Sequence, residues 1–169
     1  MKCIPQIKES NAVEVLKKRE NIFQREKNVR RSELIYLPYY LFSFNIYLAD
    51  GKVESSFVCV DLIGGECAHL RDKTNIVQGN KTAEFNNVIT ENEAAERARK
   101  FIINEILHKK KKYLNFLTME IKLETVLEYP YWIGYFQKKN GIDFNVIDGI
   151  TGQKQGPKMK TIFIKFLMQ

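Results

Sequence analysis

The strongest constraint in this 169-residue chain is a pattern that occurs twice: a short alternating strand, an aspartate and a turn that contains glycine. The first copy is "VCVDLIGG", residues 58–65, and the second is "NVIDGITG", residues 145–152. An aspartate at a turn usually accepts hydrogen bonds from nearby backbone amides, and glycine supplies the positive φ that many turns need. We therefore expect Asp61 and Asp148 to be structural residues at the ends of two strands.

Each copy follows a helix-like stretch and a long apolar strand. Residues 11–31 carry apolar side chains at a spacing near seven, and residues 90–108 open with the T-x-x-E pattern of a capping box. The segment "LPYYLFSF", residues 37–44, then matches "YPYWIGYF", residues 129–136, with the prolines aligned and an aromatic pair after each. A hairpin turn and a return strand follow both segments. The shared order of these landmarks predicts an internal duplication.

The second half resembles a PepSY-type domain. The similarity lies in the D-x-x-T-G turn from Asp148 to Gly152 and in the alanine-rich helix start "NEAAERARKF", and it covers residues 90–155. The first half lacks the threonine of that turn. The resemblance implies one helix packed on a small antiparallel sheet, in a non-catalytic module that is often associated with peptidase regulation. It supplies no catalytic residue.

The predicted fold class is α+β, with two pseudo-repeats of a helix plus an antiparallel β-hairpin, in a cystatin/PepSY-like arrangement. The expected organisation is a first helix–hairpin pseudo-repeat at residues 1–70, a polar linker at 71–89 and a second, PepSY-like pseudo-repeat at 90–169. The chain ends in an expected amphipathic helix after Pro157, because its apolar residues fall at i, i+3, i+4, i+7 and i+8.

The formal net charge of +7 would suit an acidic partner such as nucleic acid or an anionic membrane. No nucleic-acid-binding motif accompanies the charge, so a lysine-rich surface that keeps the protein soluble is the simpler interpretation. The basic residues most relevant to such a partner are Lys109–Lys112, Lys138, Lys139, Lys154, Lys158 and Lys160. The aromatic residues at 131, 132 and 135 would then stack on bases, although strand aromatics more often pack in a core.

The three cysteines fit no disulfide framework, which favours a reducing, cytoplasmic setting. The first ten residues contain no apolar signal-peptide core, and secretion stays open if a leader is missing from this sequence. The longest apolar run, residues 34–42, is too short to span a membrane.

The sequence gives little support for a catalytic activity. The spacing of Cys59, Cys67 and His69 is not usual for zinc, and a nucleophilic pair of Cys67 and His69 lacks an orienting third group. No phosphate-binding or dinucleotide-binding glycine motif is present in the sequence. We therefore expect neither an enzyme nor a bound metal or cofactor.

The function expected from the sequence is non-enzymatic binding of an unknown protein or peptide, with peptidase regulation as one form of it. An exposed strand edge near Pro38 or Pro130 would accept an extended segment. The candidate binding residues are Tyr39, Tyr131, Trp132, Lys138 and Lys139. The alternative is a basic surface that binds nucleic acid or an anionic membrane.

Overall fold

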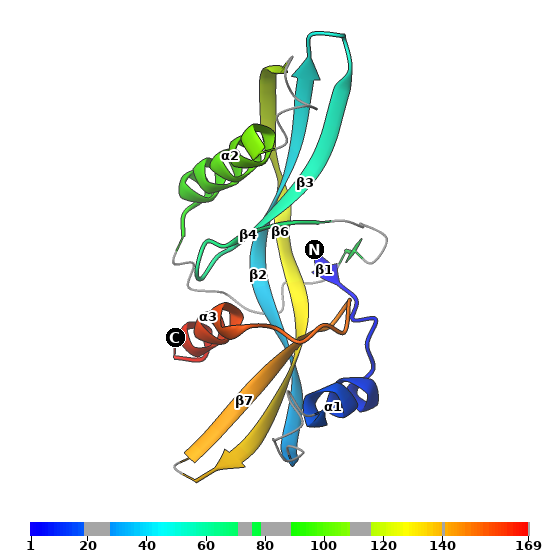
Figure 1. The fold of residues 1–169 in the computed structure, drawn as a ribbon, viewed down its shortest axis with the longest axis vertical. Helices are drawn as coiled ribbons and strands as arrows, with labels where there is room; N and C mark the ends of the chain where they lie inside the picture. The colour runs from blue at the N-terminus through cyan, green and yellow to red at the C-terminus, as the bar shows by residue number, and fades with distance from the viewer. Residues whose placement is uncertain (19–27, 71–75, 79–88, 109–115, 140, 169) are drawn as a thin grey trace. The chain divides into compact units, whose positions relative to one another are not determined.

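The structure is a computed structural model that describes residues 1–18, 28–70, 76–78, 89–108, 116–139 and 141–168. Its elements in chain order are shown in Figure 1. They are β1 (Lys2–Cys3), α1 (Glu9–Lys17), β2 (Val29–Leu48), β3 (Val53–Asp61), β4 (Cys67–His69), β5 (Ile76–Val77), α2 (Glu91–His108), β6 (Phe116–Lys138), β7 (Gly141–Asp148) and α3 (Pro157–Leu167).

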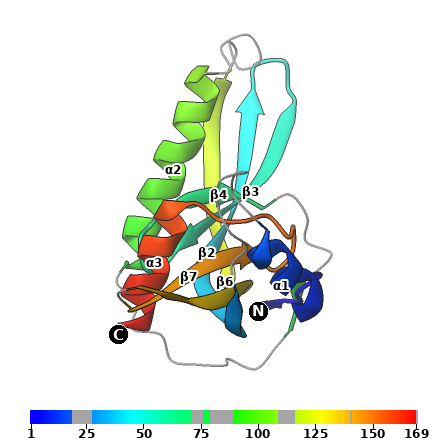
Figure 2. The ribbon, with the colours of Figure 1, turned by 60° about the horizontal axis from the view of Figure 1, so that its bottom comes forward.

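Seven strands of the described residues hydrogen-bond into one sheet. Their order is β4-β3-β2-β6-β1-β5, and β7 pairs with β6 away from this path. The two longest strands, β2 and β6, are neighbours in the order and run side by side in Figure 2. β2 and β3 pair in antiparallel register with Tyr39 opposite Asp61, and β6 and β7 do so with Tyr131 opposite Asp148.

The chain forms two compact units, and each takes residues from both halves of the sequence. Unit 1 contains Met1 and Pro38–Leu127, and unit 2 contains Lys2–Leu37 and Glu128–Gln169. In unit 1, α2 packs on β3 and β4, whereas in unit 2 both α1 and α3 pack on β7. The strands β2 and β6 each contribute residues to both units.

The predicted repeats of a helix with its own hairpin are therefore wrong. The first helix, α1, contacts β7 of the second hairpin, and α2 contacts β3 of the first hairpin. The fold is a mixed α/β arrangement with a seven-stranded sheet, and the described residues contain three helices. The physical reason is that an apolar helix stripe specifies that a helix packs on a sheet, but not which hairpin offers the complementary face.

The helix predicted for residues 11–31 is also corrected. α1 begins at Glu9, its N-cap residue Lys8 makes no side-chain capping bond, and the helix ends at Lys17. Val29, which was expected on the helix, starts β2, and residues 19–27 lie outside the described part of the chain. Much of the expected linker, residues 71–89, lies outside it too.

The other two predicted helices are confirmed. At the start of α2, Thr90 Oγ1 accepts a hydrogen bond from the Glu93 amide at 3.3 Å, and the Glu93 carboxylate accepts one from the Thr90 amide at 3.0 Å. This is the reciprocal capping box that the sequence predicts. α3 begins at Pro157, in the first turn where proline is tolerated.

The first aspartate turn follows β3. Asp61 Oδ1 accepts hydrogen bonds from the Ile63 amide, at 3.0 Å, and from the Gly64 amide, while Oδ2 accepts one from the Glu66 amide at 2.7 Å. Gly65 has a φ of +73°, a conformation that favours glycine. The Asp61 side chain is buried, so these amide donors offset the cost of removing its charge from water.

The second turn repeats this hydrogen bonding after β7. Asp148 Oδ1 accepts hydrogen bonds from the Ile150 and Thr151 amides at 2.8 and 2.9 Å. The Gly152 amide donates to the Asp148 carbonyl at 2.9 Å, and Gly152 has a φ of +72°. The expected structural role of both aspartates is confirmed, and the two turns have matching backbone geometry.

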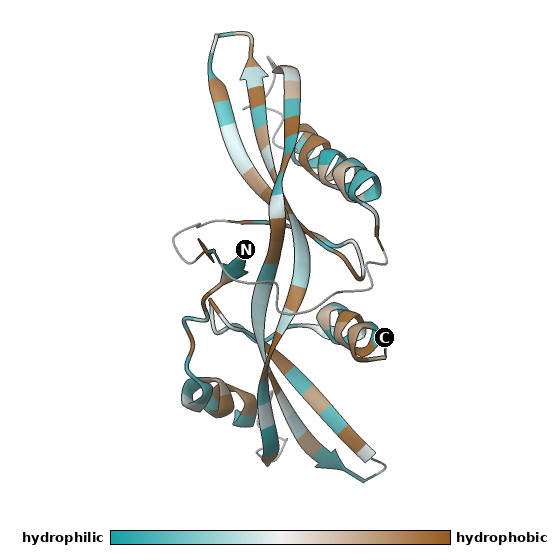
Figure 3. Cartoon of the chain, turned by 180° about the vertical axis from the view of Figure 1, so that it is seen from behind, coloured by the Kyte–Doolittle hydropathy of each residue, from teal (hydrophilic) through white to brown (hydrophobic). Residues whose placement is uncertain are grey.

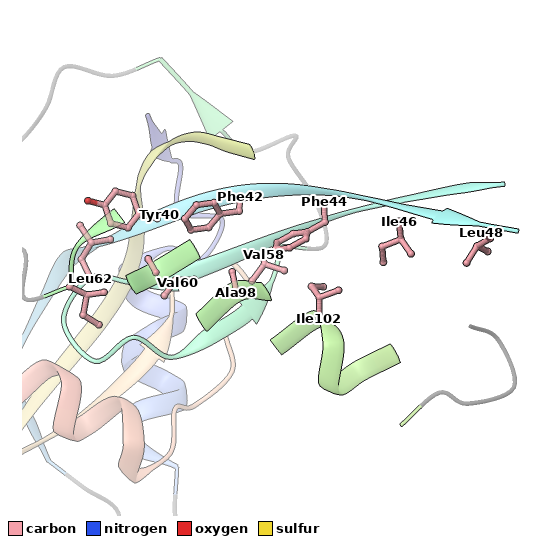
Figure 4. Close-up of a cluster of buried hydrophobic side chains, with 12 residues drawn as sticks. Tyr40, Phe42, Phe44, Ile46, Leu48, Val58, Val60, Leu62, Ala98 and Ile102 are labelled. Atoms are coloured by element: carbon pink, nitrogen blue, oxygen red, sulfur yellow. The ribbon is translucent and has the colours of Figure 1, made fainter. Parts of the chain in front are cut away.

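Unit 1 buries its core between α2 and the β2–β3 hairpin (Figure 4). The even-numbered residues of β2 from Tyr40 to Leu48 all face this core, as the alternation of the strand predicts. α2 contributes Ala94, Ala98 and Ile102, which lie at i, i+4 and i+8 on one helix face. The two alanines allow the helix to approach the hairpin closely.

Unit 2 contains a second core cluster, in which Ala12 and Leu16 of α1 pack with Ile147 of β7. Gly134 of β6 makes room for this packing, because a Cβ atom there would lie 2.6 Å from Leu16 Cδ1. α3 packs on the same unit through buried Phe163, whose ring meets the Tyr131 ring edge-on at 5.3 Å between centroids.

Candidate functional site

A cavity of about 140 Å³ lies in unit 1, between α2 and the strands β2, β3 and β4. The hairpin strands place residues 46 and 54–56 along one side, β4 adds His69, and one face of α2 covers the other side. The lining residues are Ile46, Glu54, Ser55, Ser56, His69, Ile102, Glu105 and Ile106.

A histidine and a glutamate form the polar rim of this cavity. His69 Nε2 lies 2.6 Å from Glu105 Oε2, and about a third of each side chain is exposed to solvent. The His69 ring also packs on Phe101, with ring centroids 5.2 Å apart. These two contacts hold the imidazole of His69 between β4 and α2.

The cavity also contains a buried hydroxyl group that lacks a partner. Ser56 Oγ is shielded from solvent and makes no hydrogen bond within the described part of the chain. The neighbouring Ser55 differs, because its hydroxyl donates to Asn45 Oδ1 at 2.8 Å. A buried hydroxyl without a partner costs about 1–3 kcal/mol, so Ser56 marks a position where a ligand group would be favourable.

Sequence reasoning missed this cavity, although a signal was present. Alternate residues of β3 face α2, and Val58 and Val60 fill the core there. On the same face, Glu54 and Ser56 interrupt the apolar alternation near the start of the strand. That interruption indicates a polar opening at the end of the core.

The structure distributes the predicted aromatic site residues over both units. Tyr39 lies in unit 1 and is 7% exposed, whereas Tyr131 lies in unit 2 and is 6% exposed. Trp132, also in unit 2, is half-buried, and its indole Nε1 donates to the Ile7 carbonyl at 2.8 Å. These three rings take part in packing within their units, and none of them lines the cavity.

The predicted basic site residues lie at the end of β6, in unit 2. Lys138 pairs with Asp143 of β7, which also pairs with Lys160 of α3. Lys139 is exposed to solvent. Both lysines are therefore on the surface beside the second hairpin and separate from the lining of the cavity.

The cysteines near the cavity have the character of core residues. Cys59 is buried, as the sequence indicates. Burial raises the pKa of the Cys67 thiol to about 11, with Arg97 opposing the shift. A thiol with that pKa is protonated at neutral pH and is a poor nucleophile. Within the described ranges, no group of three or more His, Cys, Asp or Glu side chains is placed to hold a metal ion.

The expected strand edges near the prolines are not found. Pro38 lies in β2, which has β3 on one side and β6 on the other. Pro130 lies in β6, beside the pairing with β7, and its carbonyl accepts a hydrogen bond from the Gly149 amide at 2.9 Å. Both prolines are buried in interior strands.

The chain matches no known protein family, no curated protein and no solved structure. Among the helices that the structure describes, none is both long enough and apolar enough to cross a membrane.

Proposed function

We propose that this protein is a non-enzymatic binding module for a protein or peptide, and that the unit 1 cavity receives one basic side chain of that partner. The observation that carries the proposal is the buried, unpartnered hydroxyl of Ser56 inside a cavity with two carboxylates. A peptidase-regulating role, implied by the resemblance to PepSY-type domains, stays a prediction.

The size of the cavity supports a side chain as the occupant. Pockets for whole cofactors and drug-sized ligands usually measure about 300–1,000 Å³, which exceeds the volume of about 140 Å³ found here. A single long side chain with an extended aliphatic stem is compatible with that volume.

The lining of the cavity favours a basic side chain over an acidic or a purely apolar one. Ile46, Ile102 and Ile106 offer apolar contact to the methylene stem of a lysine or arginine. Glu54 and Glu105 supply two negative charges, and a carboxylate accepts several hydrogen bonds at once, so existing partners do not prevent another. The ammonium or guanidinium group would also donate to Ser56 Oγ.

Peptides test this proposal directly. We suggest titrating the full chain with acetyl-Ala-Ala-X-Ala-Ala-amide peptides, where X is lysine, arginine, leucine or glutamate, and recording ¹H–¹⁵N spectra. The lysine and arginine peptides should shift the amide signals of Ser56, His69 and Glu105, whereas the glutamate peptide should not.

Two serine substitutions in unit 1 provide a matched comparison. Ser56→Ala should weaken binding of the lysine peptide about tenfold or more, since it removes one hydrogen bond to a charged group. Ser43→Ala should leave the affinity unchanged, because Ser43 donates to Glu124 and does not line the cavity. Equal binding of the glutamate peptide, or no shifts with any peptide, would contradict the proposed site. Cleavage of a peptide, detected by mass spectrometry, would contradict a non-enzymatic role.

Salt dependence separates this mode from nucleic-acid binding. The affinity for a peptide held by a single ion pair should fall only modestly between about 50 and 200 mM salt. The affinity for a nucleic acid held by six to ten phosphate contacts would fall by about 10³–10⁵ over the same range.

A further inference from the structure

The strand β3 is longer than the strand that pairs with its outer edge. β2 pairs with β3 along its whole length, from Val53 to Asp61, whereas β4 pairs only with residues 58–60. One more backbone bond follows, in which the Leu70 amide donates to the Phe57 carbonyl at 2.9 Å. The first part of β3, next to the β2–β3 turn, therefore extends past β4 (Figure 1).

The backbone of this first part has unused hydrogen-bonding groups. Backbone groups of an antiparallel strand point alternately to its two neighbours, and the Phe57 carbonyl and the Asp61 amide both bond on the side of β4. Val53 and Ser55 therefore point their N–H and C=O groups to the same side, beyond the end of β4. Within the described part of the chain these four groups have no backbone partner. Val53 is 51% exposed, and Ser55 is exposed too.

We call residues 53–55 the open edge of β3, and this edge adjoins the cavity of unit 1. Glu54 and Ser55 line the cavity, and so does His69 at the end of β4. The even-numbered side chains of β3 face α2. In an added strand, the residue opposite Glu54 would direct its side chain to the same face, and hence toward the cavity.

The chemistry of the open edge selects an extended peptide as its occupant. Outward N–H and C=O groups of a strand are satisfied together by the backbone of another strand. The first part of β3 mixes hydrophobic and hydrophilic residues (Figure 3), so it offers no continuous apolar strip to a partner. The affinity for a partner would come from backbone hydrogen bonds and from the cavity.

We propose that the partner peptide binds as an added antiparallel strand on the open edge of β3, with its basic residue opposite Glu54. This inference rests on the proposed function and specifies the bound conformation of the peptide. The residues on either side of the basic one exchange backbone hydrogen bonds with Ser55 and Val53. The basic side chain between them enters the cavity, which Ser56 and Glu105 also line. Backbone pairing provides affinity and the cavity provides selectivity.

A second copy of this chain fits the open edge less well than a basic peptide. A copy that paired antiparallel over the same three residues would place its Glu54 opposite the first Glu54. Like charges directly opposite each other in a sheet are destabilising. A lysine or arginine instead brings a donor that the carboxylate accepts alongside its present partners.

Peptides with a methylated backbone test the added strand, with acetyl-Ala-Ala-Lys-Ala-Ala-amide as the reference and the full chain as the receptor. An N-methyl group on the alanine before the lysine removes the N–H that bonds to Ser55, and one on the alanine after it removes the N–H that bonds to Val53. Each should weaken binding about fivefold or more. N-methylation of the lysine is the matched control and should leave the affinity unchanged, because that amide points away from β3.

A pair of protein variants tests the same edge from the other side. Ser55→Pro and Ser55→Ala both lose the hydroxyl, but only proline also removes the outward amide, which β2 does not use. Ser55→Pro should bind the lysine peptide about fivefold or more weakly than Ser55→Ala. Thermal unfolding followed by circular dichroism establishes that both are folded. In the unmodified protein, the bound peptide should slow hydrogen exchange of the Val53 and Ser55 amides.

The outcomes separate this inference from the proposed function. If the lysine peptide shifts no amide signals, both are overturned. If it binds, but all three methylated peptides bind as tightly as the reference and exchange at Ser55 is unchanged, only the added strand is overturned. If Ser55→Pro does not fold, the methylated peptides and the exchange rates decide. A dimer detected by light scattering, and abolished by Ser55→Pro but not by Ser55→Ala, would also overturn the inference, because a second copy would then occupy the open edge.

Discussion

The Tyr129 hydroxyl lies 3.1 Å from both carboxylate oxygens of Asp148 and donates its proton to that carboxylate. The same carboxylate accepts hydrogen bonds from two backbone amides of the turn after β7. Asp148 therefore joins the turn to the side chain of a residue in β6, and the stability of unit 2 depends on it.

Substitutions at this pair should be destabilising and coupled. Tyr129→Phe should lower the free energy of unfolding by about 1.5–3 kcal/mol, the usual value for a hydrogen bond to a charged group. Asp148→Ala should cost more, since it also removes the acceptor of two turn amides. Urea denaturation of both single variants and the double variant would measure the coupling energy. A fully additive double variant would show that the hydrogen bond contributes nothing to stability.

Stability should fall at alkaline pH. Burial, with nearby Asp148 adding to it, raises the pKa of Tyr129 well above its usual range, and burial with the hydrogen bond to Glu33 raises the pKa of Tyr135 to about 12. Because both folded-state pKa values exceed the unfolded value of about 10, the stabilisation is complete below pH 10 and is lost as pH rises above it.

The measurement is the free energy of unfolding in urea across the alkaline range. Tyr135→Phe should reduce the slope of stability against pH above about pH 10, since it removes one of the titrating groups. The buried thiol of Cys3 should also lower the stability as the pH rises. Burial raises its pKa to about 11, so this loss begins near the unfolded cysteine pKa of about 8.5. A slope unchanged in Tyr135→Phe would show that this hydroxyl has the same pKa in both states.

Gly134→Val should destabilise unit 2 by about 1–3 kcal/mol through overpacking. A Cβ at this position would lie 2.6 Å from Leu16 Cδ1, and Leu16 is 1% exposed and has little room to move. Combining the change with Leu16→Ala should recover part of the loss, because the smaller side chain relieves the clash. Thermal unfolding of the three variants checks this. If Gly134→Val unfolds at the same temperature as the unmodified protein, α1 does not pack tightly on β6.

The two halves of the chain should not fold separately. Fragments 1–70 and 89–169 each lack strands or helices that complete a unit, since α2 packs on β3 and α1 packs on β7. Each fragment alone should show no cooperative unfolding, and an equimolar mixture should regain it, as measured by circular dichroism. Cooperative unfolding of fragment 89–169 alone would instead support the helix-plus-hairpin repeat that the sequence suggested.

Much of the local structure of this protein could be predicted from its sequence. The capping box of Thr90 and Glu93, the alternation along β2 and the aspartate turns at Asp61 and Asp148 depend on residues close together in the chain. Period-two and helical patterns, together with turn chemistry, specify such features locally. The cavity could have been found only in part, through the polar interruption at Glu54 and Ser56.

The partners of each element were decided by tertiary structure. The apolar stripe of α1 would suit either hairpin, and Gly134 on β6 provides the space for Leu16 that brings this helix to the second one. The contact between His69 and Glu105 likewise joins two residues that are 36 positions apart in the chain. The sequence by itself determined strands, turns and two of the three described helices, because their signals are local. Only the tertiary structure decided which helix packs on which hairpin, because that choice depends on the shapes of surfaces that exist only after the strands have paired.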